Sequence, residues 1–302
     1  MIIVAANPYS GAADNRRRVE ALARALASAD TSPRVVWDPR ERAVTLADRA
    51  AMAGCRAVVA VGGDGTIAQV INELPPGTPL AVLPAGTENL FAAVHGFADD
   101  PATLTRALAA GRTRAVDLGR ASVLGRSRHF ALMLTAGLDA AVVHRVAAWR
   151  EAGAALRRVR RASYVAPIAA SLATYRHPVV RVIAGDVAAS GAYCFVANAP
   201  AYALDLPVAP DARADDGALD WVMFERRGLA ALAVYSWAVW RRRHLVRADV
   251  RTGRATRLTI DAATPVPVQV DGDPLGTTPV EVEIMPGALQ VIATDTDRAD
   301  RG

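Results

Sequence analysis

The sequence contains no lysine, and all 35 of its basic residues are arginine. This absence excludes a P-loop lysine, a Schiff-base lysine and every kinase mechanism that depends on lysine. Any contact with phosphate must therefore come from arginine or from backbone N–H groups. The arginine clusters lack the stacked aromatic strands or finger spacing of nucleic-acid readers, so we expect no nucleic-acid partner. They suit phosphate or an anionic membrane surface, and they lie at Arg157–Arg158, Arg160–Arg161, Arg226–Arg227 and Arg241–Arg243.

The small number of cysteines and the lack of long apolar runs bear on where in the cell the protein is expected. Cysteine is limited to Cys55 and Cys194, both in apolar runs, which predicts small core residues in a reducing compartment. No run reaches the roughly 18 apolar residues that a membrane span needs, and Met1–Asn7 lacks the basic start and the length of a signal peptide. We therefore expect a cytoplasmic protein without a transmembrane segment, and we leave peripheral attachment at the inner membrane face open.

Residues 61–66 read Val-Gly-Gly-Asp-Gly-Thr and lie between an apolar strand-like run and an amphipathic helical run. Three glycines in four positions let the backbone turn tightly at the end of a strand. They leave N–H groups bare beside a helix N-terminus, where anions are stabilised. Asp64 would repel phosphate in such a nest unless a divalent cation or a water molecule lay between them. The pattern favours a nucleotide-phosphate site over a purely structural turn.

Strand-like and helix-like runs alternate over the first 118 residues. Apolar runs at 2–6, 33–37, 55–61, 80–83 and 114–118 are separated by helical patterns at 15–28, 44–53, 66–74, from 90 onward and at 101–110. This alternation predicts a doubly wound, mostly parallel sheet. Ligands of such sheets bind beyond the carboxyl ends of the strands. The loops 7–11, 62–66 and 84–89 are expected to converge there.

The alternation of strand-like and helix-like runs ends after residue 118. Strand-like stretches follow at 119–124, 128–135, 179–184, 192–198, 218–224, 256–261, 266–270 and 288–293. Gly, Asp and Pro turns between them favour an antiparallel sandwich, interrupted by helical patterns at 140–175, with a break near Gly153, and at 229–243. We therefore predict an α/β N-terminal domain over 1–118, a mainly antiparallel β-sandwich C-terminal domain with helical insertions over 119–295, and a disordered tail over 296–302.

Five motifs occur in order along the chain: Asn7-Pro-Tyr-Ser-Gly11, Gly62-Gly-Asp-Gly-Thr66, Leu83-Pro-Ala-Gly-Thr-Glu-Asn-Leu-Phe91, Ala209-Pro-Asp-Ala-Arg-Ala-Asp-Asp-Gly-Ala-Leu-Asp220 and Val270-Asp-Gly-Asp-Pro274. Together they resemble the diacylglycerol kinase catalytic domain of soluble bacterial lipid kinases, which sphingosine and ceramide kinases share. The resemblance implies a NAD kinase-like fold.

The resemblance also implies that ATP is the phosphoryl donor and that Mg²⁺ bridges its phosphates. A backbone nest and Mg²⁺ would supply the positioning and charge neutralisation that phosphoryl transfer needs, without lysine. The residues that would border the nucleotide are Asn7, Ser10, Gly11, Gly62, Gly63, Asp64, Gly65, Thr66 and Thr87.

Two acidic turns carry the other implied roles. The family's general base is a glutamate that falls on Asp273, with Asp271 beside it to orient the base or a metal-bound water. Asp-Gly is also a strong hairpin signal, so a plain turn at 270–273 stays open. The family's structural Mg²⁺ would be held by the carboxylate of Asp216 and the carbonyls of Arg213 and Ala218. A plain Asp-Asp-Gly turn is an even alternative there.

Three departures from the family pattern bear on activity. Asp273 stands where the family has glutamate, Ala68-Gln69 replace asparagine-glutamate, and Glu88 brings a carboxylate to the predicted phosphate site. We expect an ATP-dependent lipid kinase whose partner is a lipid substrate at the membrane surface. The alternatives are a NAD kinase-like phosphotransferase and a non-catalytic lipid- or nucleotide-binding pseudo-kinase. A homodimer is also left open.

The segment Leu229–Arg247 combines Tyr235, Trp237 and Trp240 with Arg241–Arg243. Aromatic rings beside arginines suit a membrane interface, where the rings lie at the headgroups and the arginines meet anionic lipid. A helix that packs on the sandwich and ends in a solvated basic turn explains the same pattern. The sequence alone favours neither.

Overall fold

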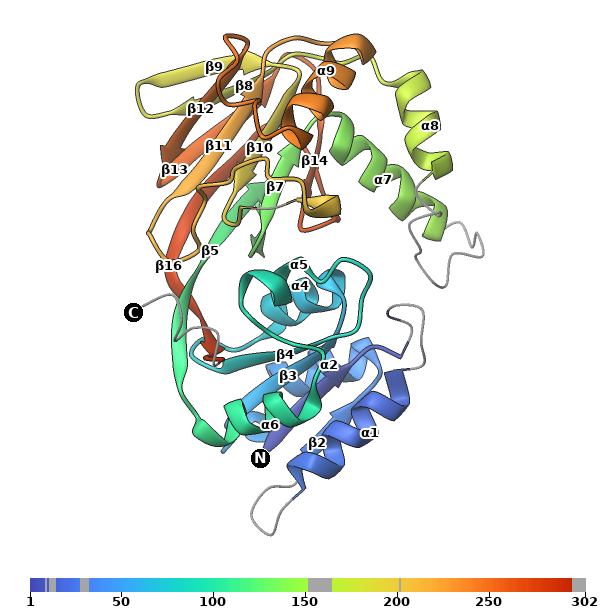
Figure 1. The fold of residues 1–302 in the computed structure, drawn as a ribbon, viewed down its shortest axis with the longest axis vertical. Coiled ribbons are helices and arrows are strands. Elements are labelled where there is room, and N and C mark those ends of the chain that lie inside the picture. Colours follow the sequence, from blue (N-terminus) through green and yellow to red (C-terminus); the bar gives the residue numbers. More distant parts are fainter. Residues whose placement is uncertain (9, 11–14, 28–32, 152–164, 201, 295–302) are drawn as a thin grey trace. The chain divides into compact units, whose positions relative to one another are not determined.

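The computed structural model describes residues 1–8, 10, 15–27, 33–151, 165–200 and 202–294. Gly11, the arginines at 157–161 and the predicted tail at 296–302 lie outside the described residues. The chain divides into two compact units (Figure 1). One is formed by Met1–Val116 and the chain from Gly287 onward, and the other by the chain between them, from Asp117 to Pro286. Each unit is described by itself.

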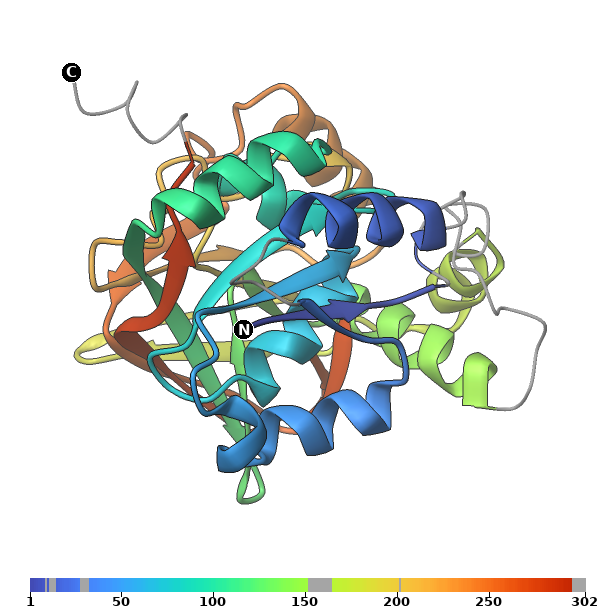
Figure 2. The same ribbon diagram turned by 90° about the horizontal axis from the view of Figure 1, so that it is seen from below.

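The first unit is a parallel sheet with helices on both faces, as the alternation of its sequence predicts. Its strands β1 (Ile2–Ala6), β2 (Pro33–Val36), β3 (Ala57–Gly62) and β4 (Pro79–Pro84) pair in the order β2-β1-β3-β4. Its helices are α1 (Asn15–Leu26), α2 (Pro39–Ala47), α3 (Arg49–Met52), α4 (Asp64–Glu73), α5 (Leu90–Val94) and α6 (Pro101–Ala110). In Figure 2, α1 and α6 pack together on one face, and α2 and α4 cover the other.

The second unit contains two antiparallel sheets. One has the order β12-β11-β10-β7-β14-β15; its strands are β7 (Met133–Ala136), β10 (Tyr193–Ala197), β11 (Leu219–Phe224), β12 (Val250–Ala255), β14 (Pro267–Val270) and β15 (Asp273–Thr277). The other has the order β16-β13-β8-β9, and β5 joins β16 to β6; its strands are β5 (Thr113–Val123), β6 (Arg126–Phe130), β8 (Val180–Ala184), β9 (Val187–Gly191), β13 (Arg257–Ala262) and β16 (Val280–Ile292).

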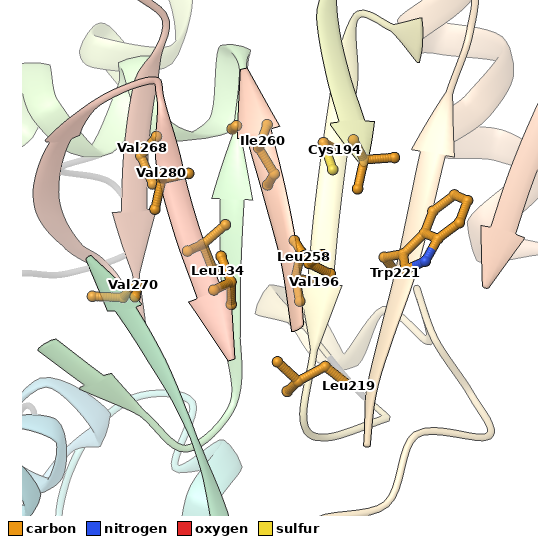
Figure 3. Packing of buried hydrophobic residues seen from close by; sticks show 14 of the residues in the cluster. Leu134, Cys194, Val196, Leu219, Trp221, Leu258, Ile260, Val268, Val270 and Val280 are labelled. Atoms are coloured by element: carbon orange, nitrogen blue, oxygen red, sulfur yellow. The ribbon is translucent and has the colours of Figure 1, made fainter. Parts of the chain in front are cut away.

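The core of the sandwich lies between these sheets. Figure 3 shows Leu134, Val196 and Trp221 of one sheet among Leu258 and Ile260 of the other, all of them buried. Side chains alternate along β10 and β11, because successive residues of a strand point to opposite faces. Cys194, Val196 and Trp221 therefore face this core, while Tyr193 and Phe224 face a second apolar cluster. The predicted combination of an α/β domain and an antiparallel sandwich is confirmed.

The helices of the second unit are α7 (Leu138–Glu151), α8 (Val165–Thr174), α9 (Leu229–Trp240) and a short 3₁₀ turn at Ala203–Asp205. Tyr235 and Val239 of α9 and the half-buried Leu172 of α8 pack on the second cluster, with Tyr193 and Phe224. The sheet that contains β10 and β11 is thus covered on both faces.

The long strand β16 departs from the predicted domain division. Its first residues pair antiparallel with β13 in the second unit, whereas Gln290 and Val291 pair parallel with Pro79 and Leu80 of β4. The chain from Gly287 onward therefore belongs to the first unit, and the predicted second domain at 119–295 does not keep the end of this strand. Local periodicity does not reveal this, because a strand looks the same whichever sheet its neighbours belong to.

Candidate functional site

The glycine turn of the first unit lies at the carboxyl end of β3 and opens α4. Gly63 is the N-cap, and Thr66 and Ile67 both donate backbone N–H groups to its carbonyl, at 2.9 and 3.1 Å. Within the part of the chain that the structure describes, no acceptor is found for the amides of Gly63 and Gly65. They lie where the helix dipole favours an anion. The local geometry is that of a phosphate nest.

The loop that follows β1 meets this turn through side chains. The Asn7 amide donates to the Thr66 hydroxyl at 3.1 Å, and the Ser10 hydroxyl lies 3.3 Å from the same oxygen. The buried Asn15, which the sequence analysis did not single out, donates to the carbonyls of Asn7 and Ser10, both at 2.9 Å. The structure thus brings three of the predicted nucleotide residues together. The one sequence signal for Asn15 was its position at the start of a helix directly after the loop.

The loop that follows β4 interlocks with the turn through glycines. A Cβ atom on Gly86 would lie 2.4 Å from the Cα of Gly63, and one on Gly63 would lie 2.9 Å from the Cα of Gly86. Gly62 is held as tightly, since its Cβ would reach the Thr66 side chain at 2.6 Å. These backbones approach so closely that only glycine fits. Thr87, beside Gly86, is exposed.

Asp64 makes a contact that its position in the nest does not predict. Its carboxylate accepts the N–H of Phe91 at 3.0 Å, at the start of α5. Burial raises the pKa of Asp64 above its ordinary value, although backbone hydrogen bonds from Phe91 and Leu90 favour the charged form. Asp64 therefore ties the two loops together. Within the loop that follows β4, Asn89 accepts the Gly86 N–H at 2.8 Å.

One departure from the family pattern has a local explanation. The carbonyl oxygen of the Gln69 side chain accepts a hydrogen bond from Arg42 at 3.0 Å, and Glu73 forms a bidentate pair with the same buried guanidinium at 2.7 and 2.9 Å. Gln69 thus belongs to a polar cluster between α2 and α4. Its side chain satisfies Arg42, which would otherwise leave a buried charge partly unpaired.

In the second unit, Asp271 and Gly272 form the two-residue hairpin turn between β14 and β15. Their φ angles are +46° and +84°, and Val270 pairs with Asp273 across the turn. The Asp271 carboxylate accepts the backbone N–H groups of Ala131, Leu132 and Met133 at 2.7 to 3.0 Å. It anchors the link between β6 and β7.

Asp273, the predicted base, lies at the start of β15. One of its oxygens is 2.5 Å from the guanidinium of Arg128 on β6, and both side chains are about a quarter exposed. The pair holds the carboxylate in one direction while leaving it accessible to solvent. Arg128 carried no sequence signal, because its position on β6 is separated from Asp273 by 145 residues.

A buried polar network lies behind this turn. The Gln269 amide donates to the Thr135 hydroxyl at 2.9 Å and to Asp139 at 3.2 Å, and its carbonyl oxygen accepts the Gly272 N–H at 2.8 Å. Thr135 and Tyr202 also donate to the Asp139 carboxylate. Burial raises the pKa of Asp139, and these hydrogen bonds oppose the rise. The network links the start of α7 to the turn that carries Asp273.

The predicted structural metal loop contains an ion pair. Asp216 accepts the Ala218 N–H at 3.2 Å through one oxygen, and its other oxygen lies 2.5 Å from Arg254 of β12. The Arg213 side chain pairs with Asp215. No group of three or more His, Cys, Asp or Glu side chains able to hold a metal ion occurs among the described residues. The carboxylate that Mg²⁺ would need is thus already paired with a guanidinium. The metal role of Arg213, Asp216 and Ala218 stays a prediction.

Fold and site together define a class: an α/β unit with a backbone-built anion nest, joined to an antiparallel sandwich. Solved structures share this architecture. A diacylglycerol kinase from Bacillus anthracis str. Sterne superimposes with a TM-score of 0.67 at 17% identity, covering 98% of this chain and 97% of that chain. An NAD kinase from Archaeoglobus fulgidus in complex with ATP gives 0.58 at 12% identity, covering 100% and 97%.

The sequence comparisons give the family. Residues 1–121 match the diacylglycerol kinase catalytic domain, and residues 133–293 match the YegS C-terminal NAD kinase beta sandwich-like domain. A diacylglycerol kinase of Mycobacterium tuberculosis is 28% identical over 79% of this chain and 77% of its own length. A protein of Pseudomonas aeruginosa named "probable lipid kinase YegS-like" is 26% identical over 91% and 88%. The chain belongs to the family defined by the YegS C-terminal NAD kinase beta sandwich-like domain, and its N-terminal part is similar to the diacylglycerol kinase catalytic domain.

Proposed function

We propose that the protein is an ATP-dependent lipid kinase, which transfers the γ-phosphoryl group of MgATP to a hydroxyl of diacylglycerol or a related lipid. The observation that carries the proposal is the glycine nest at the N-terminus of α4, where the amides of Gly63 and Gly65 find no acceptor among the described residues. In a chain without lysine, phosphate must be held by such amides or by arginine. Kinship with diacylglycerol kinases supports the choice of acceptor.

The chemistry we assign to the first unit is binding and orientation. The amides of Gly63 and Gly65 would donate to phosphate oxygens, and the loop bearing Asn7 and Ser10, held through Thr66, would border the rest of the nucleotide. Mg²⁺ supplies charge neutralisation when it arrives with the phosphates. Catalysis of phosphoryl transfer relies on such positioning and electrostatic stabilisation more than on covalent chemistry.

The chemistry we assign to the second unit is proton transfer. Asp273 would accept the proton of the lipid hydroxyl as the oxygen attacks the γ-phosphorus and the bond to ADP breaks. Arg128 would keep the Asp273 carboxylate oriented. Asp271 is not the base in this scheme, since three backbone N–H groups engage its oxygens. At the membrane, this activity would place the protein on the inner face, peripherally.

The test is an acceptor assay with γ-labelled ATP and Mg²⁺, supplied with either diacylglycerol in mixed micelles or NAD. Label is expected on the lipid and none on NAD. Label on NAD alone would favour the NAD kinase-like alternative. An absence of turnover together with retained nucleotide binding would favour a pseudo-kinase.

Gly65→Ala links that activity to the nest. Gly65 is exposed in the first turn of α4, its φ is negative, and its Cβ would have no neighbour within 4 Å. The variant should fold as well as wild type or slightly better, because alanine is favoured over glycine in helices by about 1 kcal/mol. If phosphate contacts this amide, the added methyl group should raise the KM for ATP about tenfold. An unchanged KM would show that ATP does not bind there.

A further inference from the structure

The helix α9 and the turn that follows it, residues Leu229–Val246, expose an unusual amount of apolar side chain. Trp237 is 62% exposed, Trp240 59% and Val246 85%. Leu229, Val234 and Leu245 are exposed as well. We call these six residues the α9 surface. Large apolar groups gathered at one place on a folded protein mark a site that something covers.

The exposed residues and the packed residues of α9 lie on opposite sides of the helix. Tyr235 and Val239 face the cluster formed with Phe224, and the Nε2–H group of His244 after the helix donates to the Val208 carbonyl at 2.8 Å. The helix and the turn after it are therefore anchored, and the exposure of Trp237 and Trp240 follows from the fold. Figure 1 shows α9 (orange) alongside the strands of the second unit. Of the two explanations that the sequence left open, packing on the sandwich holds for one side of the helix, and the membrane interface stays a prediction for the other side.

The two tryptophans form a single aromatic platform. They are three residues apart, which places them on one side of a helix, and their ring centroids are 4.9 Å apart. The Arg241 guanidinium lies 6.0 Å from the Trp237 ring centroid. Indole rings combine a large apolar body with one polar N–H group, so they favour the boundary between hydrocarbon and water.

Along the chain, the segment that carries the platform has charges of one sign. Arg241, Arg242 and Arg243 are all exposed directly after the helix. No acidic residue occurs between Glu225 and Asp249. A second copy of this chain that docked through the same surface would bring these arginines against their own counterparts, because a two-fold interface pairs a patch with itself. An anionic partner avoids that repulsion.

We propose that the α9 surface docks on an anionic lipid bilayer, with Trp237 and Trp240 at the level of the headgroups and Arg241–Arg243 against lipid phosphates. The helix would lie in the plane of the interface rather than cross it. No helix among the described residues is long and apolar enough to span a membrane. Docking does not require catalysis; if the acceptor is a lipid, as proposed above, it brings the enzyme to its substrate.

The experiment is co-sedimentation of the full chain with vesicles of phosphatidylcholine alone or mixed with phosphatidylglycerol. Wild type should bind the mixed vesicles, with tryptophan emission shifted to shorter wavelength, and binding should weaken as salt is added. Trp237→Ala/Trp240→Ala should bind about tenfold more weakly or worse. Arg241→Gln/Arg242→Gln/Arg243→Gln should lose roughly 100-fold, because each arginine near an anionic surface contributes about a factor of five.

Matched controls lie elsewhere on the chain. Leu124→Ala/Val187→Ala removes two large apolar side chains that are also exposed, 92% and 55%. Arg40→Gln/Arg126→Gln/Arg181→Gln removes three exposed arginines. Both controls should bind the mixed vesicles within about twofold of wild type, since neither alters the α9 surface.

Three results would overturn the proposal. The first is wild type that does not bind the mixed vesicles, and the second is tryptophan and arginine variants that bind them as tightly as wild type does. The third result is a wild-type dimer in solution that the tryptophan variant disrupts. A parallel assay on a short-chain diacylglycerol, soluble as a monomer, separates this inference from the kinase proposal. The tryptophan variant should keep wild-type activity there and lose it on vesicles. If wild type binds vesicles but phosphorylates neither substrate, the kinase proposal fails and docking stands.

Discussion

The dipeptide Asp-Gly occurs three times, and two of these copies, Asp64-Gly65 and Asp271-Gly272, take different backbones. The first opens α4 with a negative φ at Gly65, while the second forms a hairpin turn with φ positive at both residues. The difference arises from the flanking sequence. An apolar helical pattern follows Gly65, whereas a short strand that pairs back on Val270 follows Gly272. The same local signal therefore serves two folds.

The two copies share one property. Each aspartate uses its carboxylate to accept backbone N–H groups from another segment: Phe91 in one case, and Ala131 to Met133 in the other. The groups left for chemistry are their neighbours, namely the amides of Gly63 and Gly65 in the first unit and the carboxylate of Asp273 in the second. The first unit offers a site built from backbone, and the second a site built from side chains. This contrast can be tested by substitution.

The largest effect is expected for Asp273→Asn. Removing the proposed base should lower kcat on lipid by about 10²- to 10⁴-fold, the usual contribution of general base catalysis. Stability should change by less than about 1 kcal/mol, since the ion pair with Arg128 is partly exposed. Steady-state kinetics and urea unfolding measure both. Arg128→Gln is the companion variant, and it should lower kcat less than Asp273→Asn does. Wild-type kcat in Asp273→Asn would remove the base from the second unit.

Gly86→Ala tests the backbone-built site. Its new Cβ would lie 2.4 Å from the Cα of Gly63, so the two loops must separate. We expect roughly a 100-fold fall in kcat/KM for ATP, because displacements of about 1 Å at a catalytic site have that effect. Gly63→Ala should behave alike, as both glycines meet at one contact. A Gly86→Ala enzyme with normal kcat/KM would show that the interlock is dispensable.

Asp271→Ala should act on stability first. Three buried N–H groups lose a charged acceptor, and we expect the free energy of unfolding to fall by about 2 to 3 kcal/mol. Urea denaturation measures the loss, with Asp273→Ala as the neighbouring control that should cost far less. Equal losses in the two variants would contradict the division of roles within the turn.

Asp139→Asn probes the network behind the turn through pH. Burial raises the folded-state pKa of Asp139 above its usual 3.8. The folded protein therefore holds this proton where the unfolded chain has released it, and stability falls as the pH rises from about 4 through the folded pKa. Asparagine does not titrate, so the variant should lose less stability over that window. Asp64 also has a raised pKa, but it titrates in both proteins. The difference in the free energy of unfolding between wild type and variant therefore reports Asp139 alone. If this difference in unfolding free energy did not vary with pH, Asp139 would not have a raised pKa in the folded protein.

The smallest effect concerns the 213–218 loop. Because Arg254 already neutralises Asp216, the thermal midpoint of wild type should not change when EDTA removes Mg²⁺. Arg254→Gln should cost less than about 1 kcal/mol, as its pair is exposed, and its midpoint should rise again with Mg²⁺. Arg126→Gln serves as the control. A drop in the wild-type midpoint with EDTA would restore the predicted metal site.

Much of the first unit could be predicted because its signals are local. Helix α6 was predicted at its observed bounds, since Asp100 caps it before Pro101 and Gly111 ends it with a positive φ. Helix α2 begins earlier than its apolar pattern indicates, because Asp38 accepts the N–H groups of Arg40 and Glu41 ahead of the first apolar residue. The capping residue, rather than the apolar pattern, sets the start of this helix.

The strands that escaped prediction share a position. β9, β12 and β15 all lie at the edge of a sheet, where strands are short and carry charged residues, glycine or proline that limit pairing with other molecules. β15 begins Asp-Pro, and β12 contains Arg-Thr-Gly-Arg. Such segments lack the apolar alternation that identifies a half-buried strand. Their pairing is settled by the neighbouring strand.

The sequence by itself determined the alternation of strands and helices in the first unit, the glycine turn and the absence of a lysine that could hold phosphate. Periodicity, turn chemistry and composition act over a few residues, so they can be read without the fold. Only the tertiary structure decided which side chains meet: Arg128 with Asp273, Asp271 with a segment 138 to 140 residues earlier, and Arg254 with Asp216. Hydrogen bonds and ion pairs are short-ranged, so their partners depend on which strands the fold brings together.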